Sequence, residues 1–362
     1  MKFFRELARY LVGGLFIFSG LIKINDPVGT AIKLEEYFEV FAQDFAPFFE
    51  QFVPAALFLA VFLSVLEVIL GVAVLINHRM PIVSITLIVM IIFFTFLTFY
   101  SAYFNKVTDC GCFGDAIKLT PWQSFYKDVV LFFLIFVIFF NFHNYKEFLS
   151  TRIQNIIMTL VTLGSIAVAL MAIWYLPFID FRSYKVGNDI GQLMQPEEPG
   201  KYLYIMEKDG KEYEMEAYPS DPGYKLIEAK LLNADKAVAK ISDFGVWNDD
   251  GEFTEEILTG TKLIFIFHDV EKSNRKHVGQ MKDLAVASGM DTWILTSSGY
   301  EAFEAFRHDE QLAFPFYYSD ATVLKTMIRS NPGIMLFKDG VVLGKWHHNA
   351  VPNSLQLNKL TQ

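Results

Sequence analysis

The sequence predicts an α-helical membrane bundle followed by an external α/β domain. Two observations lead to this fold class. First, 53% of the 362 residues are hydrophobic and 37 are phenylalanine, a composition that is unusual for a soluble protein of this length. Second, the apolar residues are concentrated before about Pro177, whereas the acidic remainder alternates short strands with short helices. That alternation is the pattern of an α/β layer fold.

Five stretches of the first half are long enough to cross a bilayer, which takes about 20 apolar residues. A buried core helix would be shorter and polar on one side, whereas these stretches are apolar all round. The first one resembles a signal peptide in its basic start, but no small-residue cleavage site follows it, so we expect it to be retained. The five predicted spans are Ala8–Ile24, Val53–Ile76, Pro81–Phe104, Trp122–Phe142 and Ile156–Phe178.

Basic residues near the span ends predict the orientation. With the N-terminus in the cytoplasm, five spans place the C-terminal domain in the periplasm of a bacterium, outside its inner membrane. The opposite loops also carry lysines, so the bias is modest. The periplasm is oxidising, so cysteines that face it can form a disulfide. The basic residues on the cytoplasmic side are Lys2, Arg5, Arg9, Arg79, Lys146 and Arg152.

The only two cysteines, Cys110 and Cys112, stand one residue apart in the segment TDCGCFGD. Closing so small a ring stabilises a chain by only about 1.6 kcal/mol, against about 4.7 kcal/mol for a hundred-residue loop. The pair is therefore placed for chemistry or for metal binding. Gly111 and Gly114 allow positive φ angles in this loop. A capping box at Thr120 starts the fourth span directly afterwards and holds the loop at the membrane surface.

Residues 29–52 are too charged to span a membrane, but their apolar residues recur at helical spacing. This pattern predicts an amphipathic helix, bent near Pro47, that covers the outer end of the bundle as a lid. The alternative is a solvated surface helix. The predicted apolar face consists of Leu34, Tyr37, Phe38, Phe41, Phe45, Phe48 and Phe52.

Ionisable residues inside membrane spans are candidates for a functional site. Glu67 lies near the middle of the second span, and Lys127 and Asp128 lie about two turns into the fourth. Glu67 is either a group that handles protons or contacts a cofactor, or a structural acid. A structural acid would be paired with Arg9 or kept neutral by its apolar surroundings.

These residues resemble the DoxX/MauE-type redox membrane proteins. The resemblance covers about residues 1–145 and rests on Arg9, the segment FSGLIKINDP, Glu67 and above all the DCGCFGD loop. It implies a four-helix bundle associated with disulfide formation or quinone-linked thiol oxidation, with Cys110 and Cys112 as the redox pair. A fifth span within residues 146–180 and the external domain give a layout similar to DoxX-family proteins of Bacteroidetes.

The external half is expected to contain a β-rich connection, residues 181–240, and an α/β domain, residues 241–362. Asp209-Gly210 between two alternating segments is a strong hairpin signal. The α/β domain resembles the thioredoxin-like fold, with Asn331-Pro332 as its cis-proline, peptide-binding loop. Where that family carries C-x-x-C, this sequence reads HDVEKSNRK. Without a cysteine the domain cannot exchange disulfides.

The leading hypothesis is a membrane thiol–disulfide redox protein in which Cys110 and Cys112 act, supported by Gly111, Gly114, Glu67, Arg9, Lys127 and Asp128. The external domain would bind a periplasmic client or a thioredoxin-like carrier. No cofactor is predicted from the residues, and quinone is a candidate.

Two alternatives remain open at the level of sequence. One is a non-enzymatic assembly or partner-binding membrane protein, and the other is soft-metal handling by the C-x-C thiolates. Isolated histidines such as His268 and the pair His347-His348 predict no metal site. A net charge of −9 argues against nucleic acid as a partner.

Overall fold

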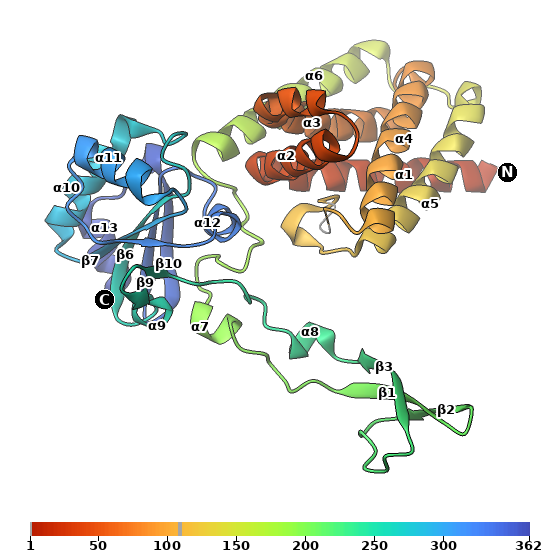
Figure 1. Cartoon of the computed structure of the whole chain (residues 1–362). Coiled ribbons are helices and arrows are strands. Elements are labelled where there is room, and N and C mark those ends of the chain that lie inside the picture. Colours follow the sequence, from red (N-terminus) through yellow and green to blue (C-terminus); the bar gives the residue numbers. More distant parts are fainter. Residues whose placement is uncertain (1, 108–110) are drawn as a thin grey trace. The chain divides into compact units, whose positions relative to one another are not determined.

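The computed structural model describes residues 2–107 and 111–362. It divides into two compact units, Met1–Phe181 and Arg182–Gln362 (Figure 1). The finer division predicted within these units, at residues 145, 180 and 240, stays a prediction.

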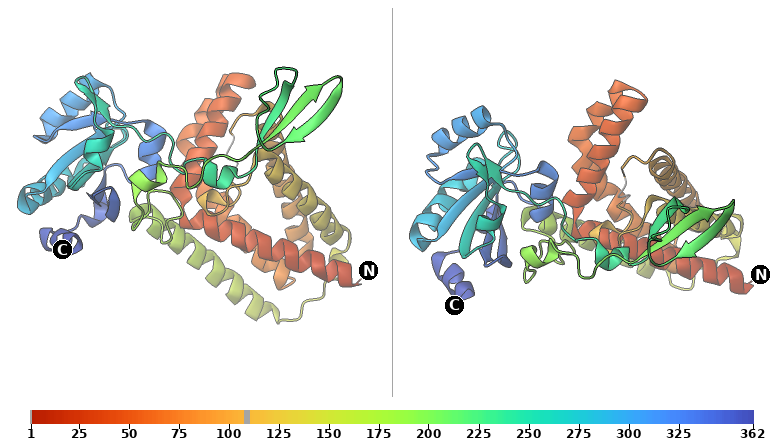
Figure 2. Two further views of the ribbon diagram at one scale, coloured as in Figure 1. Left: turned by 90° about the horizontal axis from the view of Figure 1, so that it is seen from below. Right: turned by 60° about the horizontal axis from the view of Figure 1, so that its bottom comes forward.

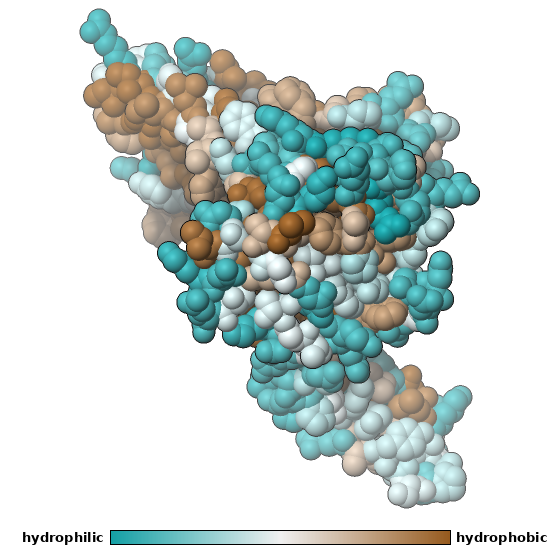
Figure 3. Space-filling model, turned by 90° about the vertical axis from the view of Figure 1, so that its left-hand side faces the viewer, coloured by the Kyte–Doolittle hydropathy of each residue, from teal (hydrophilic) through white to brown (hydrophobic). Residues whose placement is uncertain are grey.

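The described part of the first unit contains five helices that are long and apolar enough to cross a membrane, as predicted. The protein is therefore a multi-pass membrane protein. The two units also differ in their surfaces. In Figure 3, hydrophobic residues gather on the helical unit, whereas the α/β unit is mostly hydrophilic. The helices are α1 (Lys2–Asn25), α3 (Ala56–Leu75), α4 (Met80–Phe104), α5 (Pro121–Phe140) and α6 (Thr151–Trp174).

Helices α1 and α3 pack against each other through glycines. A Cβ atom on Gly20 of α1 would lie 2.6 Å from Val68 Cγ2 and 2.9 Å from the Ser64 carbonyl oxygen. A Cβ atom on Gly71 of α3 would lie 2.8 Å from the Gly13 carbonyl oxygen. Small residues at such an interface let two membrane helices approach closely. The close approach brings polar residues of α1 within reach of α3.

Helix α2 (Pro27–Asp44) lies against this bundle. Its N-terminus is capped by Asp26, whose carboxylate accepts a hydrogen bond from the Gly29 amide at 2.8 Å. One face of α2 is buried against α3 and α4, so the alternative of a solvated surface helix is wrong. The buried residues on this face include Ala31, Leu34, Tyr37 and Phe41.

The predicted bend at Pro47 is present, and the continuous helix that would carry the predicted apolar face ends before it. Helix α2 ends at Asp44, and a 3₁₀ helix, η1 (Pro47–Ala55), leads into α3. Phe45, Phe48 and Phe52 are 57%, 51% and 38% exposed. The change of helix type breaks the 3.6-residue period on which the prediction rested.

Two contacts tie α2 to α4. The Tyr37 hydroxyl lies 2.7 Å from Ser101 Oγ, and Asp44 at the end of α2 accepts hydrogen bonds from Lys106 and Tyr100. The Lys106 ammonium, followed by the Tyr100 hydroxyl, lowers the pKa of Asp44 below its ordinary value. Asp44 therefore keeps its charge, and this tie, at neutral pH.

The second unit is built on a seven-stranded mixed sheet with the order β10-β9-β6-β7-β8-β4-β5. Strands β6, β7 and β8 are parallel, and β9 and β10 complete one side as an antiparallel pair. The strands are β4 (Trp247–Asn248), β5 (Gly251–Glu252), β6 (Thr261–Phe267), β7 (Asp291–Thr296), β8 (Phe316–Tyr318), β9 (Gly333–Lys338) and β10 (Val341–His347).

Helices α10 (Val278–Ser288), α11 (Tyr300–Glu310) and α13 (Ser354–Thr361) share one hydrophobic core with β6, β7 and β9. The remaining helices of this unit are α7 (Ile190–Leu193), α8 (Ala234–Ala237), α9 (Thr254–Ile257) and α12 (Ala321–Met327). The predicted α/β character is confirmed, and the Asn331–Pro332 bond is cis, as predicted.

A second, three-stranded sheet has the order β2-β1-β3 and is drawn in green in Figure 2. Strands β1 (Tyr202–Lys208) and β2 (Lys211–Met215) form the predicted hairpin around Asp209 and Gly210. Both turn residues have positive φ angles, 52° and 72°. The sequence did not predict β3 (Lys225–Leu231), because its residues are exposed on both faces and carry no alternating pattern.

Candidate functional site

A cavity of about 80 Å³ lies within the helical unit and is partly open. Helices α1 to α5 and the end of the cysteine loop contribute to its wall, and the space is large enough for several water molecules. Its lining is apolar apart from a set of polar side chains, which is unusual at the depth of membrane spans. The polar lining residues are Ser19, Lys23, Thr30, Lys33, Tyr37, Ser64, Glu67, Thr98, Cys112, Lys127 and Asp128.

Glu67 is the central acid of this cavity. It is 2% exposed, and its Oε1 atom lies 2.5 Å from the Lys23 ammonium of α1. Its other oxygen, Oε2, lies 2.8 Å from Ser19 Oγ, which also lies 2.9 Å from the Cys112 carbonyl oxygen. The Lys23 ammonium also lies 4.8 Å from the centre of the Phe94 ring. Glu67 is thus joined to the cysteine loop through a single serine.

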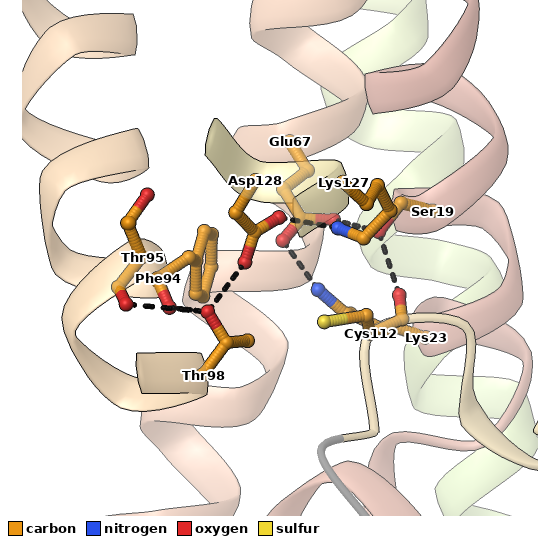
Figure 4. Close-up of polar contacts among 9 residues, drawn as sticks. All are labelled: Ser19, Lys23, Glu67, Phe94, Thr95, Thr98, Cys112, Lys127 and Asp128. Atoms are coloured by element: carbon orange, nitrogen blue, oxygen red, sulfur yellow. Dashed lines mark hydrogen bonds and ion pairs between the residues drawn. The ribbon is translucent and has the colours of Figure 1, made fainter. Parts of the chain in front are cut away.

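A second ion pair faces the same cavity from α5. Asp128 is 1% exposed and pairs with the Lys127 ammonium. The other oxygen of Asp128 accepts a hydrogen bond of 3.0 Å from the Thr98 hydroxyl of α4. Figure 4 shows both ion pairs beside Cys112. Glu67, Lys127 and Asp128, the ionisable candidates within the predicted spans, therefore all line this cavity.

The end of the cysteine loop is anchored to the bundle next to these pairs. Cys112 is partly buried, and its side chain points toward the Lys23–Glu67 pair (Figure 4). The next residue, Phe113, packs on Phe18 with ring centroids 5.5 Å apart and lies under the Lys127 ammonium. Cys110 lies outside the described residues.

The glycines of the loop adopt the backbone conformations that their type favours. Gly111 and Gly114 have φ angles of 63° and 49°, which other residues seldom adopt. A Cβ atom on Gly111 would lie 3.5 Å from Lys33 Cγ, so α2 packs over the loop at this point. The helix that follows, α5, begins with the predicted capping box between Thr120 and Gln123.

The pairing of Glu67 with Arg9 is wrong. Arg9 and Lys23 are fourteen residues apart on α1, which corresponds to about 21 Å along the helix axis. The Arg9 guanidinium instead lies 2.9 Å from Glu6 and donates a hydrogen bond of 2.8 Å to Asn77. Arg9 therefore ties α1 to the turn after α3 and does not line the cavity.

Sequence reasoning missed several members of the site, among them Ser19, Lys23, Lys33 and Thr98. Ser19 and Lys23 are four residues apart, so they share one face of α1. Both lie in the segment FSGLIKINDP that carries the family resemblance, and this spacing was the available signal. Thr98 gave no signal, because a threonine that bonds its own helix backbone is common in membrane helices.

In the α/β unit, the loop at Asn331 and Pro332 is closed against the segment after β6, residues 268–276. The Asn331 side chain donates a hydrogen bond of 2.6 Å to the Asp269 carbonyl, and the Asn331 carbonyl accepts one of 3.0 Å from the Asn274 amide. Burial lowers the pKa of His268, at the end of β6, to about 4. His268 is therefore neutral at physiological pH.

His347 and His348 lie together at the end of β10 with ring centroids 4.0 Å apart. Burial lowers the pKa of both imidazoles, that of His347 to about 3. Among residues 2–107 and 111–362, no group of three or more His, Cys, Asp or Glu side chains is placed to hold a metal ion.

Comparison with known proteins places the candidate site within a family. No curated protein and no solved structure matches the chain. Residues 1–141 match the family model described as methylamine utilisation protein MauE, and this region contains α1 to α5, both cysteines and every polar residue of the cavity. The match covers less than half of the chain. The protein is thus MauE-like over residues 1–141. The rest of the chain adds the spanning helix α6 and the α/β unit.

Proposed function

We propose that this protein is an integral-membrane thiol–disulfide redox protein in which Cys110 and Cys112 alternate between a dithiol and a disulfide. The observation that carries the proposal is the position of Cys112 at a charged cavity inside a MauE-like bundle. Buried ion pairs in a membrane are costly and usually serve function. Two such pairs beside one of only two cysteines favour chemistry over a passive role.

In the oxidising direction the chemistry is an exchange. A client dithiol and the Cys110–Cys112 disulfide give a client disulfide and the Cys110–Cys112 dithiol. Two electrons and two protons then remain on the protein and must pass to an oxidant. A quinone would accept both electrons and both protons as it becomes a quinol, and it is soluble in the bilayer.

The quinone is supported by one feature of the helical unit. A groove of about 410 Å³ between α4 and α5 is lined almost entirely by apolar side chains. Thr98 and Asp128, on the same two helices, line the cavity and bond each other. The groove residues that would hold a flat apolar ring include Phe96, Phe99, Phe125 and Phe132.

The α/β unit is proposed to be a thioredoxin-like domain that binds a client or a carrier protein. Its parallel strands β6 to β8, the antiparallel strands β9 and β10 and the cis bond before Pro332 support this assignment. The unit contains no cysteine, so any exchange takes place at the membrane loop. The predicted orientation would put the loop and the α/β unit together in the periplasm.

Trapping of a partner tests the proposal. At least one of the variants Cys110→Ser and Cys112→Ser should accumulate a mixed disulfide in native membranes, visible as a reducible band on a non-reducing gel. The double variant Cys110→Ser/Cys112→Ser is the matched control and should show no such band. If neither single variant traps a partner and the cysteines keep one redox state, the protein serves assembly or partner binding instead. Copurification of a soft metal that depends on both cysteines would favour metal handling.

A further inference from the structure

We propose that the two cysteines have unequal roles, with Cys112 as the sulfur that leaves as a thiolate and Cys110 as the sulfur that a partner attacks. This inference rests on the proposed function, because it assigns the steps of the exchange. Its basis is the set of charged groups around Cys112, which lies within the described residues. The role of Cys110 follows because it is the other cysteine of the pair.

Three ammonium groups lie around Cys112, each with a carboxylate partner. The cavity that it lines is also lined by Lys23, Lys33 and Lys127 and by the carboxylates of Glu67 and Asp128. Glu67 pairs with Lys23, Asp128 pairs with Lys127, and Glu36 lies 3.2 Å from the Lys33 ammonium. Figure 4 shows the sulfur on the side of the Lys23 ammonium, and Cys112 is close enough to Lys127 to interact with it electrostatically.

The charged groups around the sulfur come from four of the five helices that form the wall. The residues that α4 contributes to the wall are uncharged, and Thr98 is the hydroxyl-bearing one among them. Asp115, further along the loop, opposes the ammonium groups. The side chains of Lys23 and Lys127 are 10% and 22% exposed, and water screens a buried charge less than one at the surface. The charged groups are Lys23 of α1, Lys33 of α2, Glu67 of α3, and Lys127 and Asp128 of α5.

A neighbouring ammonium favours the thiolate form of a cysteine. In disulfide exchange, the thiol with the lower pKa is the better leaving group. A client thiolate therefore attacks the Cys110 sulfur, a client–Cys110 bond forms, and the Cys110–Cys112 bond breaks. The electron pair of the broken bond stays on Cys112, beside Lys127 and Lys23.

The second half of the exchange completes the balance. The other client thiolate attacks the client sulfur of the mixed disulfide, which forms the client disulfide and releases Cys110 as a thiolate. The two protons given up by the client thiols are then available to the two thiolates of the protein. Lys127 acts in these steps as a positioning residue, since it stabilises the charge without bonding to the client.

Unequal trapping tests the inference. Cys112→Ser keeps Cys110, whose thiolate attacks the disulfide of an oxidised client; the client–Cys110 bond forms, one client thiolate leaves, and no Cys112 thiolate is present to displace the client. This variant should accumulate at least tenfold more mixed disulfide than Cys110→Ser, with each amount normalised to the variant's own level in the membrane. Equal trapping, or trapping only by Cys110→Ser, would overturn the inference and leave the proposed function intact. Absence of trapping in both variants would contradict the proposed function itself.

A second measurement does not depend on any client. In a Cys110→Ser background the alkylation rate of Cys112 is measured against pH in the full-length protein. Lys127→Gln should lower the rate near neutral pH by about tenfold, which corresponds to one pH unit in the thiol titration. In Lys127→Gln the Asp128 carboxylate also loses its ion-pair partner, and its negative charge then further disfavours the Cys112 thiolate. Lys127→Arg keeps the charge and should keep the profile.

The matched control is Lys118→Gln, which removes an exposed ammonium from the same loop and should leave the alkylation profile unchanged. An identical pH profile for Lys127→Gln and Lys118→Gln would refute the stabilisation of Cys112 by Lys127. Because both variants carry the single cysteine, this outcome is read independently of whether the protein has a redox partner.

Discussion

Lys23 and Glu67 should stabilise the folded protein only as a pair. Removal of one side chain should lower the free energy of unfolding more than removal of both. Both side chains are buried, and their charged atoms lie 2.5 Å apart in the middle of the bundle. Removal of one partner from a buried ion pair leaves an uncompensated charge, at a cost of about 3–5 kcal/mol. Glu67→Leu and Lys23→Met should each reduce the free energy of unfolding by about this amount.

The double variant Lys23→Met/Glu67→Leu should be more stable than either single variant. Replacement of a whole buried pair by apolar residues of similar volume is often neutral or stabilising. Glu67→Gln should cost less than Glu67→Leu, because the amide oxygen can still accept a hydrogen bond from Lys23 while the amide NH2 group can donate one to Ser19 Oγ. Glu67→Lys should cost most, since a second lysine in mid-span adds about 2.5–3.5 kcal/mol on insertion scales.

The measurement is a double-mutant cycle on the purified protein in detergent micelles, with unfolding followed by circular dichroism. The effects of the two single variants on the free energy of unfolding are added and compared with the effect of the double variant. Agreement to within about 0.5 kcal/mol would show that the two groups are not coupled. That result would refute the ion pair as the element that joins α1 to α3. Loss of thiol redox activity in Glu67→Gln at normal protein level would instead show that the charge of Glu67 is needed for function.

Three further predictions concern other parts of the chain. Gly20→Ala should destabilise the bundle by about 1–3 kcal/mol, because its Cβ atom would lie 2.9 Å from a backbone oxygen of α3, whereas Gly14→Ala has open space and should be neutral; equal melting temperatures for the two variants would contradict the glycine packing. The α/β unit should lose stability as the pH falls from about 6.5 to about 4, because the unfolded chain binds protons that buried His268 accepts only at about 4 and that His347 and His348, whose pKa values are also lowered, resist as well. His268→Leu should reduce the slope of thermal melting against pH in that window, and an unchanged slope would exclude His268 as one of its causes. A cysteine introduced by Asn144→Cys in a background without Cys110 and Cys112 should resist an impermeant maleimide added from the periplasmic side, and labelling there would reverse the proposed orientation.

The main features of the helical unit could be predicted because they depend on local composition. Each span is a run of apolar residues whose length matches the bilayer, and a charge such as Glu67 is conspicuous within it. The partner of that charge could not be predicted, because it depends on the axial register of α1 against α3. Arg9 and Lys23 are both basic residues on α1, and only the glycine contacts decide which of them reaches Glu67.

The α/β unit shows the same division between local pattern and context. Strands β6, β7 and β9 are continuous apolar runs that are buried on both faces, so their sequence alone indicates them. Strand β3 is exposed at almost every position, and β8 has only three residues. Such strands are held by the neighbour that they pair with, and a single sequence does not show which neighbour that is.

The hydroxyl of Ser19 has one hydrogen atom and two acceptor oxygens within bonding distance, Glu67 Oε2 and the Cys112 carbonyl. The Glu67 carboxylate and the loop therefore share this hydrogen or compete for it. A movement of the loop that takes Cys112 away from Ser19 leaves the hydrogen to Glu67, and by thermodynamic reciprocity a stronger bond from Ser19 to Glu67 loosens the hold on the loop. One hydrogen atom thus links a carboxyl group inside the bundle to the backbone of the cysteine loop.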